Sequence, residues 1–142
     1  MAESPPIRWR IAVEAVCNLF WARLLCLLPM RRWSRWAHLR VLKGESTVDI
    51  QQTDVRIVQR HLRAASRRVP WRADCLPQAL AAVSMLARRG YTPVLALGAR
   101  SSAETAKMSA HAWVECAGIV VCGGPIHRSF PTVVRLIRLA RR

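Results

Sequence analysis

The sequence predicts an α+β fold in which helices come first and a small antiparallel sheet follows. Two observations support this order. Apolar residues recur at helical spacing through the first half of the chain, and short apolar runs separated by turn residues fill much of the second half. Helices and strands segregated in this way pack as a helical layer against a sheet. A length of 142 residues with 52% apolar content is enough for one domain with its own core.

Three helices are predicted before the centre of the chain. The first covers Ile7–Leu28 and ends near Pro29, the second covers Arg31–Leu42, and the third covers Thr53–Arg67 with its apolar residues on one face. Glu14, Asn18 and Arg23 interrupt the first helix, so it lacks the uninterrupted apolar run that a membrane span needs. We therefore expect no membrane span, and we read residues 1–66 as an arginine-rich helical region.

A fourth helix is predicted to begin at Cys75. Asp74 is a suitable N-cap, Pro77 is tolerated in a first turn, and Gly90 follows two arginines in the manner of a helix end. Residues 67–142 then form the remaining part of a single compact domain, in which this helix packs on the sheet.

The strands are expected after Gly90. They cover Thr92–Ala99, Ser109–Cys116 and Ile119–Cys122, with a polar loop over residues 100–107 and a tight turn at Ala117–Gly118. Apolar residues in Thr132–Arg142 fall at helical spacing, which favours a short final helix. A strand over residues 132–136 is the alternative.

Charge and cysteine content limit the classes of function. The net charge of +15 could attract nucleic acid, an acidic peptide or an anionic membrane surface, or be simply solvated. No nucleic-acid-binding motif accompanies the arginines, and we expect no nucleic-acid partner. Five cysteines form an odd set without a CxxC pair, and no signal peptide is recognisable, so a reducing cytoplasm is expected.

Cys75 and His111 are the candidate reactive pair. A thiol at a helix start is favoured as thiolate, because the first backbone N–H groups lack intrahelical partners and the helix dipole is positive there. His111 lies in a predicted strand and could act as the base for such a nucleophile if folding brings the two together. The alternative is a structural cysteine and a strand histidine bonded to a backbone carbonyl.

Three stretches carry a resemblance to a known family. They are Trp71–Leu80, Leu86–Gly98, and Ala110–Glu115 with the glycine-bearing hairpin after it. In that order they resemble the lasso peptide leader peptidases, a transglutaminase-like cysteine protease family that includes the carboxy-terminal domain of the microcin J25 processing protein. The resemblance implies a transglutaminase/papain-like fold, with the cysteine at the start of a central helix and the histidine on the sheet.

The resemblance also implies an activity and partners. Cys75 would attack the bond between leader and core of a lasso peptide precursor, and His111 would act as general base and acid. Without a recognisable leader-binding segment, the chain is expected to work with a separate leader-binding protein and an asparagine-synthetase-like cyclase. No cofactor and no metal are expected, since the spacing of Cys116, Cys122 and His111 matches no structural zinc pattern.

The group that orients His111 is left open. The family's aspartate after the histidine is missing, and a two-residue turn at 117–118 places Gly124 opposite His111. The candidates are therefore Glu104, Asp74 or a backbone carbonyl, since Glu115 lies four strand residues away, about 13 Å.

The oxyanion donors and the class of function each have alternatives. Backbone N–H groups near Cys75 are preferred as donors, and Gln78, one turn further on, is either a second donor or a polar surface residue. The missing aspartate supports a rival reading of the chain as a catalytically weakened, transglutaminase-like binding module of a peptide maturation complex. A basic nucleic-acid or membrane-surface protein is a third reading, based on charge alone.

Overall fold

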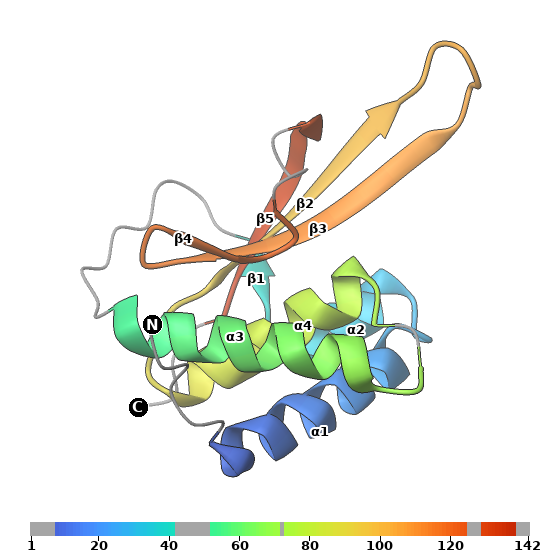
Figure 1. Ribbon diagram of the computed structural model, residues 1–142. Helices are drawn as coiled ribbons and strands as arrows, with labels where there is room; N and C mark the ends of the chain where they lie inside the picture. Colours follow the sequence, from blue (N-terminus) through green and yellow to red (C-terminus); the bar gives the residue numbers. More distant parts are fainter. Residues whose placement is uncertain (1–7, 42–51, 72, 125–128, 139–142) are drawn as a thin grey trace, which may run out of the picture.

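A computed structural model describes residues 8–41, 52–71, 73–124 and 129–138 (Figure 1). Helices lie on one side of the molecule and a twisted sheet on the other. The helices are α1 (Trp9–Leu25), α2 (Met30–Trp36), α3 (Gln52–Arg68) and α4 (Cys75–Arg88). The strands are β1 (Arg40–Val41), β2 (Val94–Ser101), β3 (Met108–Cys116), β4 (Ile119–Cys122) and β5 (Thr132–Ile137).

Every strand pair in the sheet is antiparallel, and the strand order is β1-β5-β2-β3-β4. The β2–β3 hairpin is long, with residues paired from Val94–Glu115 to Ser101–Met108, and it extends past the helices (Figure 1). The α+β class and the packing of helices against an antiparallel sheet that carries His111 are confirmed.

The core lies between α4 and one face of the sheet. Most of α4 from Ala79 to Ala87 is buried, and it contacts β3 together with α1 and α3. Because side chains alternate along a strand, one face of β3 turns to the helices. The core residues on that face are Ala112, Val114 and Cys116. A single core cluster joins residues from α1 through β5, so both halves of the chain contribute to one hydrophobic interior.

Two turns follow the sequence closely. Gly90 adopts φ +85° after α4, as expected for the residue that ends a helix. Ala117 and Gly118 both have positive φ, 51° and 74°, which is the backbone of a type I′ hairpin turn. Cys116 therefore pairs with Ile119 as predicted.

The chain end differs from the preferred prediction. Residues 132–137 form β5 rather than a helix, and the strand fills the place between β1 and β2. Val134 and Leu136 face the core, two residues apart, so the segment follows the alternating spacing of a strand and not the spacing of a helix. Residues 139–142 lie outside the described part.

The second helix is shorter than predicted. It ends at Trp36, because His38 adopts a left-handed conformation with φ 55° and Leu39 N–H donates back to the carbonyl of Ser34. The chain then enters β1 at Arg40. The first helix also begins later and ends earlier than predicted, at Trp9 and Leu25.

Candidate active site

Cys75 is the first residue of α4, and three elements meet around it. The thiol is partly buried against the core, and it lies near enough that a thiolate there would add to the raised pKa of Cys26, after the end of α1, and of Cys122, at the end of β4. The start of α4, the end of α1 and the end of β4 therefore lie close together here.

The start of α4 has backbone donors available. Gln78 N–H donates to the carbonyl of Asp74, and Pro77 has no N–H to offer. The N–H groups of Cys75 and Leu76 have no acceptor among the described residues. Such donors at a helix start are suited to an anion, either a thiolate or the oxyanion of an attacked carbonyl.

Asp74 occupies the N-cap position with extended backbone, as predicted, but its side chain makes no capping hydrogen bond to α4. The expected contact with the helix start is therefore absent. The N–H groups of the first turn therefore receive no hydrogen bond from the Asp74 side chain.

His111 lies in β3 with its ring held from three sides. Its Nε2 is hydrogen-bonded to the carbonyl of Gly123. The ring also stacks on Trp113, with centroids 6.0 Å apart, and lies 5.3 Å from the ring of Phe130. The imidazole is thus fixed by one carbonyl and two aromatic rings.

The carbonyl of Gly123 determines the role of each ring nitrogen. A carbonyl oxygen only accepts, so Nε2 carries the proton, and the neutral ring leaves Nδ1 as the acceptor. Nδ1 is therefore the nitrogen of His111 that can take a proton from a thiol.

A bulge in the β3–β4 pairing corrects the predicted register. Glu115 pairs with Val120, but Val114 pairs with Cys122, so one extra residue of β4 is inserted. The prediction that Gly124 lies opposite His111 is therefore wrong. Gly123 packs against β3 instead, where a Cβ would lie only 2.5 Å from the carbonyl oxygen of Ala112.

Cys75 and His111 approach the same region from different sides. Cys122 lies near Cys75, and the carbonyl of the next residue, Gly123, accepts the hydrogen bond of His111. However, β3 alternates regularly, so His111 leaves the strand on the face opposite Ala112 and Val114, which pack on the helices. Within the described residues, no hydrogen bond joins the Cys75 sulfur to the His111 ring.

Neither nearby glutamate orients His111. Glu104 is exposed in the loop beyond the Ser101–Met108 pair, three residues or about 10 Å along β3 from His111. Glu115 accepts a hydrogen bond of 3.0 Å from the indole of Trp113 and forms an ion pair with Arg135.

Gln78 points its side chain back along the chain. Its amide donates to the carbonyl of Ala73, which fixes the entry into α4. Gln78 also borders a hollow of about 520 Å³ between α3 and the end of β4, together with Gly123 and Gly124. The hollow is therefore bordered by Gln78, one turn after Cys75, and by Gly123, the partner of His111, but neither Cys75 nor His111 lines it.

The other cysteines differ from Cys75 in their surroundings. Burial raises the pKa of the Cys116 thiol to about 11 and that of the Cys122 thiol to about 12, and it raises the pKa of Cys26 as well. These three remain neutral thiols at neutral pH. Among the described residues, no three His, Cys, Asp or Glu side chains are grouped as a metal site.

A family model decides the affiliation of the chain. The model of the transglutaminase-like superfamily matches residues 19–135, which run from α1 into β5. The chain belongs to the transglutaminase-like superfamily. The match includes Cys75, His111 and Gly123, and it agrees with a helix that starts at a cysteine and packs on an antiparallel sheet. No curated protein and no solved structure matches the chain.

Membership of the superfamily supports chemistry of the cysteine protease type. In the described part of the chain, no helix is long and apolar enough to cross a membrane. Of the three candidates left open for the group beside His111, a backbone carbonyl is the one that bonds its ring; sequence reasoning did not identify Gly123 as its source and missed Phe130 beside the ring. The glycine pair at 123–124 was the signal for the first, but its register depends on a bulge that the sequence does not mark.

Proposed function

We propose that this chain is a cysteine peptidase that removes the leader from a lasso peptide precursor. The observation that carries the proposal is the position of Cys75, at the start of the helix that packs on the strand of His111, in a chain of the transglutaminase-like superfamily. The stretches that resemble lasso peptide leader peptidases contain both residues.

In the proposed reaction, Nδ1 of His111 takes the proton of Cys75, and the thiolate attacks the carbonyl between leader and core. The N–H groups of Cys75 and Leu76 stabilise the oxyanion. The imidazolium protonates the leaving amine, and water, deprotonated by the same ring, releases the leader from the thioester.

The proposal requires the dyad to close around the end of β4. Catalytic hydrogen bonds often form only in the substrate complex. The backbone at the end of β4 is glycine-rich, and within the described residues the β3–β4 ladder ends at the Val114–Cys122 pair, three residues short of His111 along β3. In this proposal, a polypeptide bound in the adjoining hollow brings the ring to the sulfur.

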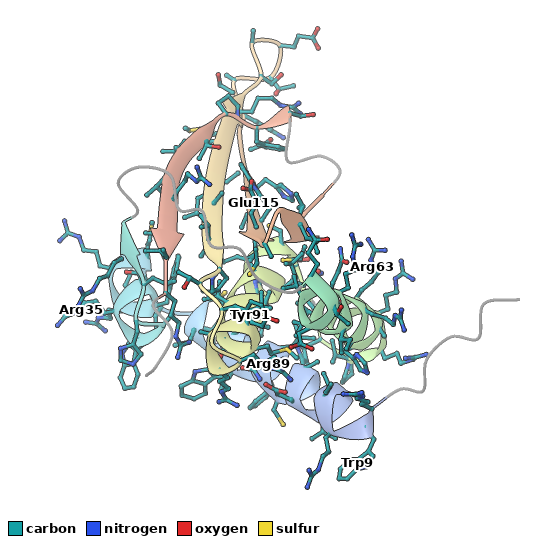
Figure 2. All side chains as sticks on the ribbon, turned by 90° about the vertical axis from the view of Figure 1, so that its left-hand side faces the viewer. Trp9, Arg35, Arg63, Arg89, Tyr91 and Glu115 are labelled. Atoms are coloured by element: carbon teal, nitrogen blue, oxygen red, sulfur yellow. The ribbon has the colours of Figure 1, made fainter. Side chains whose placement is uncertain are left out.

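Partners are part of the proposal. The outer side of α1 exposes a row of apolar residues at helical spacing, among them Trp9, Val13 and Phe20, which are 70%, 51% and 52% exposed. Figure 2 shows Trp9 pointing away from the molecule at the start of α1. We assign this row to the separate leader-binding protein, and an asparagine-synthetase-like cyclase would take the released core. Five unpaired cysteines suit a reducing cytosol.

A second function is favoured by one observation. His111 leaves β3 on the face opposite the core and is not bonded to Cys75. A transglutaminase-like binding module that holds a peptide without cutting it would have this arrangement and would need no orienting aspartate.

Cleavage of a precursor peptide distinguishes the two functions. The precursor is incubated with its leader-binding protein and this chain, and the products are read by mass spectrometry. The peptidase predicts leader and core fragments with the wild type, and intact precursor with Cys75→Ala and with His111→Ala. Cys122→Ala, which alters a partly buried neighbour of Cys75, should still cut. Equal cutting by wild type and Cys75→Ala would exclude the dyad.

A further inference from the structure

Four arginines form a row along α3. They are spaced four, three and four residues apart, so they lie on one side of the helix, over about 16 Å of its length. The opposite side carries Val55, Val58 and Leu62, which are buried in the core. We call these exposed residues the arginine row: Arg56, Arg60, Arg63 and Arg67.

The positive charge of the arginine row is uncompensated within the described residues. The two ion pairs there join Arg89 to Glu14 and Arg135 to Glu115, and neither involves α3. Figure 2 shows Arg63 directed away from the body of the molecule, among other side chains that end in nitrogen. Like charges held on one helix side favour an anionic ligand.

The carboxy-terminal half of the row borders the hollow beside the candidate site. Arg63, Ser66 and Arg67 line one side of this volume of about 520 Å³, and the end of β4 with Gly123 lines the other. None of the lining residues is acidic. An anionic chain lying along the row would therefore continue towards His111 and the start of α4.

The amino-terminal half borders a second hollow of about 520 Å³. Arg56 and Arg60 line it with Arg8 from the start of α1 and with His61. His61 is 7% exposed, and its Nδ1 is 2.8 Å from the carbonyl of Ile57, while its Nε2 has no hydrogen-bond partner.

We propose that the arginine row binds an acidic segment of the polypeptide substrate and holds it in line with the candidate site. In an extended chain, every second side chain points the same way, about 6.6 Å apart, which is close to the steps of about 4.5 to 6 Å between successive arginines. This inference rests on the proposed function for its choice of a peptide ligand. Continuity with the hollow at Gly123 favours a flexible chain over a rigid duplex.

Fluorescence anisotropy tests the row without cleavage. The protein is Cys75→Ala, and the probe is a fluorescein-labelled peptide of about twelve residues that alternates Glu and Ser. The same peptide with Gln for Glu is its control. The fourfold variant of the row, Arg56→Gln, Arg60→Gln, Arg63→Gln and Arg67→Gln, should bind the Glu peptide about thirtyfold more weakly, about 2 kcal/mol.

A matched variant removes the same charge elsewhere. The exposed arginines 31, 32, 35 and 40 belong to α2 and β1, and Figure 2 shows Arg35 on the other side of the molecule from Arg63. Replacing these four by Gln should weaken binding by no more than about threefold. Equal loss in both variants, or equal binding of the Glu and Gln peptides, would overturn the proposal.

Two further arms keep the test decisive. Arg63→Glu with Arg67→Glu should reverse the preference and bind a Lys-Ser peptide, which excludes a fold defect as the cause of lost binding. A DNA duplex that binds through the row more tightly than the Glu peptide would assign the row to nucleic acid and overturn the proposal. Because binding is read in Cys75→Ala, failure of the peptidase function would appear only in the cleavage assay.

Discussion

Replacing Gly123 by alanine tests the architecture around His111. Gly123 has φ +85°, and its Cβ would lie 2.5 Å from the carbonyl oxygen of Ala112 and 2.6 Å from the Cβ of Trp113. These contacts belong to the backbone of β3 or adjoin it, so they cannot be relieved by rotating a flexible side chain. The change should therefore displace the segment that carries the carbonyl bound to His111.

The magnitude follows from two contributions. A left-handed alanine costs about 1 kcal/mol, and forcing an extra carbon into a filled space costs about 1 to 3 kcal/mol more. Gly123→Ala should thus lower the free energy of unfolding by about 3 kcal/mol. Gly90 and Gly118 also have positive φ, but Gly90 has nothing within 4 Å of the added Cβ and Gly118 only a side-chain nitrogen at 3.9 Å.

Gly90→Ala and Gly118→Ala are therefore matched controls. Each should lose about 1 kcal/mol, and the effect of glycine on the unfolded chain is common to all three variants. Urea unfolding followed by circular dichroism measures the differences. If Gly123→Ala loses no more stability than Gly90→Ala, Gly123 does not pack on β3 as described and the placement of His111 is wrong.

Three further predictions concern cysteines and ion pairs. The Cys122 thiol has a folded pKa of about 12 against an ordinary 9.0, so its contribution to stability is full below pH 9 and is lost as pH rises towards 12. Urea midpoints at pH 8 and pH 10 should differ less in Cys122→Ala than in the wild type, and an unchanged difference would contradict burial of the thiol. Iodoacetamide at pH 7.5 should modify the exposed Cys17 at least tenfold faster than Cys116 or Cys122, as read by peptide mass mapping, and similar rates would argue against the described core. Glu14 accepts two hydrogen bonds from Arg89, which join α1 to the end of α4 and raise the pKa of Arg89. Glu14→Gln should therefore lower the free energy of unfolding by about 1 to 2 kcal/mol. Arg135→Gln breaks the longer and more exposed pair with Glu115 and should lower it by about 0.5 kcal/mol or less in the same unfolding assay.

The elements that the sequence specifies locally were predictable. Cys75 and Gly90 mark the ends of α4 through helix start and stop signals, and Ala117–Gly118 marks a hairpin turn. These signals depend on a few neighbouring residues, so they can be recognised in the sequence before the rest of the fold is known. The α+β class followed from their order.

Features that depend on tertiary pairing were not predictable. The apolar residues of 132–137 fit both a helical and a strand spacing, and the segment forms a strand because it pairs with β1 and β2 in the sheet. The bulge in β4 shifts the register by one residue, and the contact of His111 with the carbonyl of Gly123 lies beyond the last pair of the ladder. The face on which His111 leaves β3 is likewise set by which residues of the strand meet the helices.

The central claim is that His111 activates Cys75, and the alkylation rate of Cys75 tests it most directly. The rate of iodoacetamide modification at pH 6 is measured by peptide mass mapping in the wild type and in His111→Gln, each with the leader peptide bound because the dyad closes only in that complex, and Cys17 is the internal reference. The account predicts that His111→Gln slows Cys75 at least tenfold and leaves Cys17 unchanged. Equal rates at Cys75 in the two proteins would contradict the dyad and favour the binding module.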